Sequence, residues 1–214
     1  MLPNKPTLLP VLRDEYFSDY CTDRKVLHIG ACDAPFTEQK FDDRLLLHMK
    51  LDETASELVG VDVDARSIEF LRGKGISNIL EIDMNQLDTI DFEADVIIFG
   101  ETIEHLDNTR NSLTNLTRAM KQNTRLLIST PNALSLLNVF NALFRTETCH
   151  PDHVVNFTPL TLAQCLAKNG LIVEALHFTF LNRMRPSGYK RVWRLIARLF
   201  PWYAETLIVS CRLK

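Results

Sequence analysis

Two carboxylates and two histidines stand at a spacing that suits the binding of a divalent metal ion. Glu101, Glu104 and His105 lie in the segment ETIEHLD (101–107). If this segment begins a helix, positions i, i+3 and i+4 share one face, so the three side chains point the same way. His153 in HPDHVVNFTP supplies a fourth ligand, and His150 is the weaker choice. Such mixed oxygen and nitrogen ligands suit Mg, Mn, Fe or Zn without deciding among them.

The same residues have other uses that need no metal. His105 or His153 could act directly as a general base, because a histidine changes its charge near neutral pH. Glu104 and His105 could instead line a pocket, and acidic residues early in a helix are favourable for the helix dipole alone. Glu104, His105 and His153 are therefore the candidate catalytic residues.

Alternating strand and helix signals indicate which elements position these side chains. Short β-branched runs are typical of buried strands in a parallel sheet, and periodic apolar residues between them indicate helices on both faces. The strands are expected at 26–29, 57–63, 78–84, 94–100, 124–130, 171–178 and 206–211, and the helices at 64–75, 108–121, 133–144 and 158–170. The pattern predicts an α/β fold, a Rossmann-like three-layer sandwich with a mostly parallel seven-stranded sheet.

The turn after the first strand indicates a cofactor site. Ligands of such sheets bind beyond the carboxyl ends of the strands, and here Gly30 in HIGACDAP (28–35) lets the backbone turn tightly. Asp62, which ends the next strand in GVDVD, could accept hydrogen bonds from ribose hydroxyls. A nicotinamide cofactor would need further glycines for its pyrophosphate, where this chain has Ala31, Cys32 and Ala34.

The segments VLHIGACDAP, GVDVD, EIDMNQL, DVIIFGETIEHLDN and LLISTPNA, in this order, resemble the successive motifs of class I S-adenosylmethionine methyltransferases. The likeness covers about residues 25–180. It implies cofactor-binding roles at the ends of successive strands. His28, Gly30 and Ala31 would face the methionine tail, Asp62 and Val63 the ribose, Asp83 and Met84 the adenine, and Glu101 the methionine end. For His28, as for His48 and His177, a structural role is the alternative.

The pattern E-x-x-E-H, followed by a distant H-x-x-x-F, looks like the metal-binding pattern of two O-methyltransferase groups. These are the small-RNA 3′-terminal 2′-O-methyltransferases and the quinone-biosynthesis O-methyltransferases. The likeness implies that a metal would lower the pKa of an acceptor hydroxyl and aim its oxygen at the methyl group. We expect a small-molecule or glycan acceptor that could be anionic. The alternatives are methylation of an RNA end and a catalytically silent methyltransferase-like binding module.

Charge is unevenly distributed along the chain. The net charge is −3, yet residues 181–214 hold eight Lys and Arg against the single Glu205. Residues 189–202 form an amphipathic pattern whose apolar stripe, Val192, Leu195, Ile196 and Leu199, is expected to dock on the domain itself. The alternatives are a lid over an anionic substrate and a weak contact with a membrane surface. Nucleic acid is disfavoured as a partner because the rest of the chain is acidic.

The length and apolar content predict a single methyltransferase domain over residues 1–214. Residues 1–24 are expected to form an N-terminal cap segment, and residues 181–205 a basic amphipathic segment before the last strand. No cationic stretch followed by an apolar one begins the sequence, which favours a cytoplasmic protein. The oligomeric state is left open.

Overall fold

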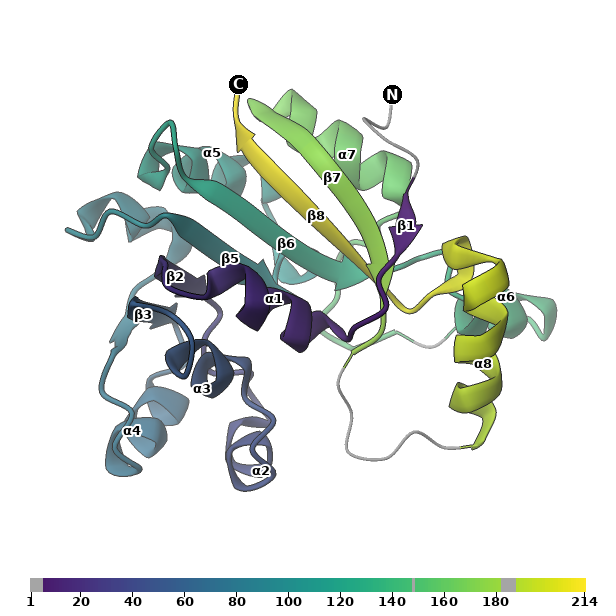
Figure 1. Cartoon of the computed structure of the whole chain (residues 1–214), viewed down its shortest axis with the longest axis horizontal. Helices are drawn as coiled ribbons and strands as arrows, with labels where there is room; N and C mark the ends of the chain where they lie inside the picture. The colour runs from purple at the N-terminus through teal and green to yellow at the C-terminus, as the bar shows by residue number, and fades with distance from the viewer. Residues whose placement is uncertain (1–5, 148, 182–187) are drawn as a thin grey trace.

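One mixed sheet forms the centre of the computed structural model, which describes residues 6–147, 149–181 and 188–214. Eight strands in these residues run in the order β1-β7-β8-β6-β5-β2-β3-β4 (Figure 1). Only β8 is antiparallel to its neighbours. The strands are β1 (Thr7–Leu8), β2 (Lys25–Ile29), β3 (Glu57–Asp62), β4 (Ile79–Glu81), β5 (Val96–Gly100), β6 (Arg125–Pro131), β7 (Leu171–Thr179) and β8 (Thr206–Leu213).

Seven of these strands match the predicted ones, and β1 corrects the expected number. Its two residues pair in parallel with His177 and Phe178 at the edge of the sheet. A two-residue strand is too short to produce a periodic signal in the sequence.

Helices cover both faces of the sheet and produce the predicted three layers. On one face, α5 (Thr109–Ala119) and α7 (Pro159–Lys168) pack against β5 and β6 through a core that includes Leu113, Leu162 and Phe99. On the other face, α1 (Arg13–Cys21) and α3 (Leu47–Asp52) pack through Phe17, Leu51 and Ile98. The remaining α-helices are α2 (Thr37–Asp42), α4 (Ala65–Gly73), α6 (Leu136–Leu143) and α8 (Gly188–Leu199).

The two predicted terminal segments are described in part. The N-terminal cap contains α1, while its residues 1–5 lie outside the described residues. The basic segment contains α8 and the short 3₁₀ helix η3 (Pro201–Tyr203), while residues 182–187 lie outside. Among the helices in the described ranges, none is long and apolar enough to cross a lipid bilayer.

The carboxyl ends of β2, β3, β4 and β5 meet at one edge of the sheet because these strands are parallel. That edge therefore gathers Gly30, Asp62 and Glu101, which come directly at or after strand ends. Two 3₁₀ helices, η1 (Met84–Thr89) and η2 (Ile103–His105), begin there as well.

Candidate functional site

The turn at Gly30 lies against the end of β5 with no room for a side chain. Gly30 has a φ of +74°, and a Cβ built on it would lie 2.6 Å from Thr102 Oγ1. Thr102 Oγ1 is held in place because it donates to the Gly100 carbonyl at 2.9 Å. Both the positive φ and the close approach require glycine here. The backbone of the first turn is thus packed directly against the residues that follow β5.

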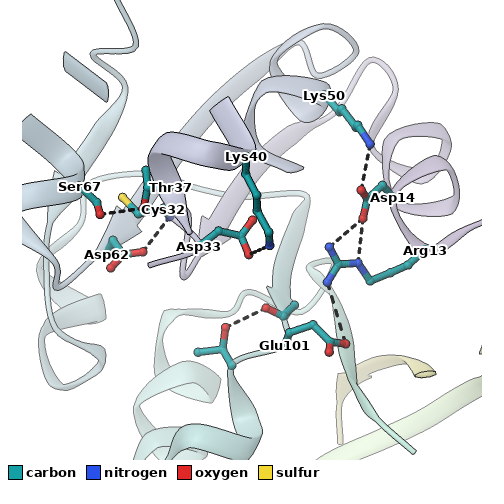
Figure 2. Close-up of polar contacts among 12 residues, drawn as sticks. Arg13, Asp14, Cys32, Asp33, Thr37, Lys40, Lys50, Asp62, Ser67 and Glu101 are labelled. Carbon is teal, nitrogen blue, oxygen red and sulfur yellow. Dashed lines mark hydrogen bonds and ion pairs between the residues drawn. The ribbon is translucent and has the colours of Figure 1, made fainter. Parts of the chain in front are cut away.

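Asp62 ties the end of β3 to this turn. Its carboxylate accepts a hydrogen bond from the backbone N–H of Cys32 at 2.8 Å (Figure 2). It also accepts from the backbone N–H of Val63 at 2.8 Å and of Asp64 at 3.1 Å. Three amides fix the orientation of the carboxylate, as a binding carboxylate needs. The side chain of Val63 is exposed beside it.

The predicted adenine-binding pair lies at the end of the next strand. Asp83 is exposed and caps η1 by accepting the N–H of Asn85 at 2.7 Å. Met84, the first residue of η1, is half-buried. Because β4 pairs in parallel with β3, these residues stand next to Asp62 along the same edge.

A buried ionic cluster joins α1 to the end of β5. Arg13 Nη2 lies 2.7 Å from Asp14 Oδ1, and Lys50 Nζ lies 2.9 Å from Asp14 Oδ2 (Figure 2). Burial alone would raise the pKa of Asp14, but the two cations together lower it. Arg13 Nη1 lies 3.9 Å from Glu101 Oε1. The sequence does not predict a site role for Arg13, because no motif contains it. It is simply a cation in the first turn of an N-terminal helix.

Glu101 and Glu104 differ from the predicted arrangement. Glu101 has a φ of +50°, and the next residues form the 3₁₀ helix η2 rather than an α-helix. The expected shared face at positions i, i+3 and i+4 is therefore wrong, because a 3₁₀ helix has three residues per turn and Glu101 precedes it. Glu104 points inward, where its Oε2 accepts from Thr130 Oγ1 at 3.0 Å.

Both carboxyl groups are largely removed from water. Burial, together with the charge of Glu101, raises the pKa of Glu104 to about 9. Burial likewise raises the pKa of Glu101, against the opposing effect of Arg13. One oxygen of each, Glu101 Oε1 and Glu104 Oε1, is buried and accepts no hydrogen bond from the described residues. Glu101 Oε1 still faces the Arg13 guanidinium at 3.9 Å, so Glu104 Oε1 is the oxygen that indicates a missing polar partner.

Three histidines converge next to these carboxylates. One ligand nitrogen each from His105, His150 and His153 lies within 4.8 Å of the others, which is the spacing of a metal site. Burial and the two neighbouring imidazoles lower the pKa of His153, so its neutral form is favoured. The contact of 3.2 Å between His105 Nδ1 and the Asp152 carbonyl assigns the proton to Nδ1 and leaves Nε2 free as a ligand atom.

The structure thus groups the predicted ligands His105 and His153 with His150 rather than with Glu101 and Glu104. Within the described residues, this is the one group in which three or more His, Cys, Asp or Glu side chains lie close enough together to bind a metal ion. The main chain holds it together, because the N–H groups of Val154 and Val155 both donate to the Glu104 carbonyl, at 2.9 and 3.3 Å.

His28 and Ala31 take buried positions beside the turn. The His28 ring stacks on His48, with the two Nδ1 atoms 3.2 Å apart. Asn78 donates through Nδ2 to Asp52 and to the Leu58 carbonyl, so its Oδ1 faces His48 Nε2–H at 3.1 Å. His48 Nδ1 must then be the acceptor for His28 Nδ1–H. The His28 side chain is occupied by this network.

Comparison with known proteins identifies the family. A methyltransferase domain family matches residues 16–176, which is most of the chain. The chain belongs to this family. No curated protein matches it.

Solved structures show that other methyltransferases share the fold of this one. An S-adenosylmethionine-dependent methyltransferase from Archaeoglobus fulgidus is 22% identical with a TM-score of 0.57, over 92% of this chain and 90% of that one. Magnesium protoporphyrin IX methyltransferase from Synechocystis, with bound S-adenosylhomocysteine, is 12% identical with a TM-score of 0.61, over 94% and 82%. The small RNA methyltransferase HEN1 is 18% identical with a TM-score of 0.63, over 99% of this chain but 26% of its own.

The protein is therefore a methyltransferase, and its edge of strand ends offers groups that fit S-adenosylmethionine. The tight turn at Gly30 presents backbone, and the Asp62 carboxylate is fixed in orientation one strand away. Arg13 and Glu101 offer a cation and an anion 3.9 Å apart. A methionine tail carries one carboxylate and one ammonium, which match these two charges.

Proposed function

We propose that this methyltransferase transfers the methyl group to a hydroxyl oxygen of a small-molecule or glycan acceptor, with the help of a metal ion held by histidines. The observation that carries the proposal is the cluster of His105, His150 and His153 at the edge where the cofactor residues lie. When bound, S-adenosylmethionine supplies an electrophilic methyl group on a sulfonium.

The chain positions the cofactor from both ends. The Gly30 turn, Arg13 and Glu101 hold the methionine end, where Arg13 takes the carboxylate and Glu101 takes the ammonium. Asp62 holds the ribose hydroxyls, and Asp83 with Met84 borders the adenine. Because positioning supplies much of the rate of a transfer reaction, these contacts serve catalysis as well as binding.

The histidine cluster supplies the acceptor side. His105, His150 and His153 would hold the ion, and an all-nitrogen set favours zinc or another transition metal over magnesium. The ion would act as a Lewis acid that lowers the pKa of the acceptor hydroxyl. Glu104 lies behind the cluster, pointing to Thr130, and its carbonyl keeps the loop of His153 in place.

Metal binding is tested by titrating zinc and magnesium into the wild-type protein and into His150→Ala and His105→Ala variants by calorimetry. We expect zinc to bind the wild type and each substitution to weaken it by tenfold or more, about the effect of removing one of three ligands. His177→Ala, whose side chain lies at the far edge of the sheet with Thr7, is the matched control. Equal zinc affinity in all four proteins would refute the ligand set.

The acceptor class is tested separately by incubating the protein with labelled S-adenosylmethionine and a panel of hydroxyl compounds, glycans and RNA. Methylated small hydroxyl compounds or glycans would support the proposal. Methylation of RNA alone would replace the acceptor class while leaving the cofactor assignment intact.

A further inference from the structure

The helix α6 turns an uncharged, apolar face to solvent. None of its residues is buried, and Phe140 and Leu143 are 54% and 75% exposed. Phe144, directly after the helix, is 65% exposed. The sequence contains no charged residue from Leu126 to Phe144. An apolar helix face normally packs on the core of its own domain, and this exposed face does not. Exposed apolar patches of this kind mark interaction surfaces.

The helix α8 adds a second exposed apolar face. The apolar stripe of this helix was expected to pack on the domain, but most of it faces solvent. Leu195 and Leu199 are 61% and 76% exposed, and Val192 is exposed as well. The helix is anchored instead through Trp193 and Ala197, which are buried. The Trp193 indole N–H donates to the Tyr203 carbonyl at 2.6 Å, and its ring packs edge-on against Phe180. Three of the four residues of the predicted docking stripe therefore face outward, while the fourth, Ile196, is half-buried.

The two faces belong to the same end of the molecule. Asn132, just before α6, donates through Nδ2 to the carbonyls of Trp202 and Ala204, at 2.8 and 2.9 Å. Its backbone N–H donates to the Glu205 carbonyl at 2.9 Å. The start of α6 and the segment after α8 are thus joined through one residue, and Figure 1 shows both helices at this end of the sheet.

The segment of the sequence that contains α8 has charges of one sign, whereas α6 is followed by one exposed cation, Arg145, and one exposed carboxylate, Glu147. Between Glu174 and Glu205 the sequence contains no carboxylate, but it contains six cations, Arg183, Arg185, Lys190, Arg191, Arg194 and Arg198. Arg198 is exposed on α8, and Arg194 lies over the Phe180 ring at 5.4 Å. A helix with exposed leucines, neighbouring aromatic residues and cations only has the composition of helices that lie in a membrane interface.

We infer that the α6–α8 face, formed by the exposed apolar side chains of 137–144 and 192–203, docks on the surface of an anionic lipid bilayer. The leucines and phenylalanines enter the interface, and the cations meet the lipid phosphates. A second copy of the chain fits this face less well. Where a symmetric dimer pairs α8 with α8, cations meet cations, and neither helix has a carboxylate to pair with them.

Sedimentation of the full chain with lipid vesicles tests the inference. One set of vesicles is phosphatidylcholine, and the other contains phosphatidylglycerol in addition. We expect binding to the anionic vesicles, and we expect it to fall steeply as salt rises from about 0.05 M to about 0.5 M, because the Debye length shortens. No binding to anionic vesicles, or equal binding to both kinds, would overturn the docking surface.

Variants locate the contact. Leu195→Glu with Leu199→Glu on α8, and separately Leu143→Glu on α6, should each reduce partition to anionic vesicles by about tenfold or more. Leu160→Glu, at an exposed position on α7, is the matched control and should bind as the wild type does. Because the substitutions on α6 and on α8 are tested in separate proteins, unfolding of one variant would not account for weaker binding of the other. Light scattering that shows a dimer dissociated by the α8 changes would overturn the membrane in favour of a second copy.

Discussion

Replacing Gly30 with alanine tests whether the first turn is shaped by the end of β5. The new Cβ would lie 2.6 Å from Thr102 Oγ1, far inside van der Waals contact. Thr102 must then rotate and give up its hydrogen bond to the Gly100 carbonyl, which costs about 1 kcal/mol. Holding a Cβ-bearing residue at a φ of +74° costs about 1 to 2 kcal/mol more. We expect the free energy of unfolding to fall by about 2 to 3 kcal/mol.

A second glycine separates the two contributions. Gly75 has a φ of +92°, but a Cβ built on it meets nothing within 4 Å. Gly75→Ala therefore measures the cost of the backbone conformation alone, about 1 to 2 kcal/mol. Urea denaturation of both variants gives the difference, which is the cost of crowding Thr102.

A third comparison introduces Gly30→Ala into a protein that already carries Thr102→Ala. Removing the hydroxyl leaves the space that the Gly30→Ala methyl needs, so the penalty at position 30 should fall to that of Gly75→Ala. The same Gly30→Ala protein should bind S-adenosylhomocysteine more weakly by calorimetry, because the turn backbone has moved. If Gly30→Ala destabilises the protein no more than Gly75→Ala does, the packing of the turn against β5 is not what requires glycine.

Three further predictions concern buried polar groups. Arg13→Gln should weaken S-adenosylhomocysteine binding by about 2 kcal/mol in calorimetry, because a charge-assisted contact with the carboxylate is lost, whereas unchanged affinity would remove Arg13 from the site. Burial lowers the pKa of His28 and of His48, so the unfolded chain binds more protons below their ordinary value of 6.5. The stability contributed by the neutral pair should be present above about pH 6.5 and should be lost as the pH falls below it, a loss that His28→Phe reduces in urea titrations at several pH values. Trp193→Phe should cost about 1 to 3 kcal/mol of unfolding free energy, since the Tyr203 carbonyl loses its donor, and a cost equal to that of the more exposed Trp202→Phe would contradict this.

The sheet was predictable from the sequence because its central strands are buried on both faces. Such strands read as continuous apolar runs that stop at Gly or Asp, as β2, β3 and β5 do. The strand β1 and the helices α2 and α3 were not predictable. Elements of two or six residues span less than two helical turns, so their apolar residues cannot show a period.

The order of residues along one edge of the sheet was predictable, but side-chain directions were not. The interval Glu101, Glu104, His105 has helical spacing, yet a positive φ at Glu101 turns the chain before any helix begins. Spacing carries no information about such a dihedral angle. In α8 the amphipathic pattern locates the apolar stripe correctly, but it cannot tell that the helix is fixed through Trp193, which finds a carbonyl acceptor in η3.

The histidine cluster is positioned by main-chain hydrogen bonds as well as by its own imidazoles, and this decides how its variants should be interpreted. Val154 and Val155 both donate to the Glu104 carbonyl, so the loop of His153 is attached to η2 through the backbone. Replacing His150 or His105 leaves both of these hydrogen bonds in place, but it removes the hydrogen bond between that imidazole and the backbone of Asp152, at 3.3 Å for His150 and 3.2 Å for His105. Loss of zinc affinity with unchanged unfolding free energy would therefore report lost ligation, whereas loss of both would indicate that the imidazoles themselves hold the loop.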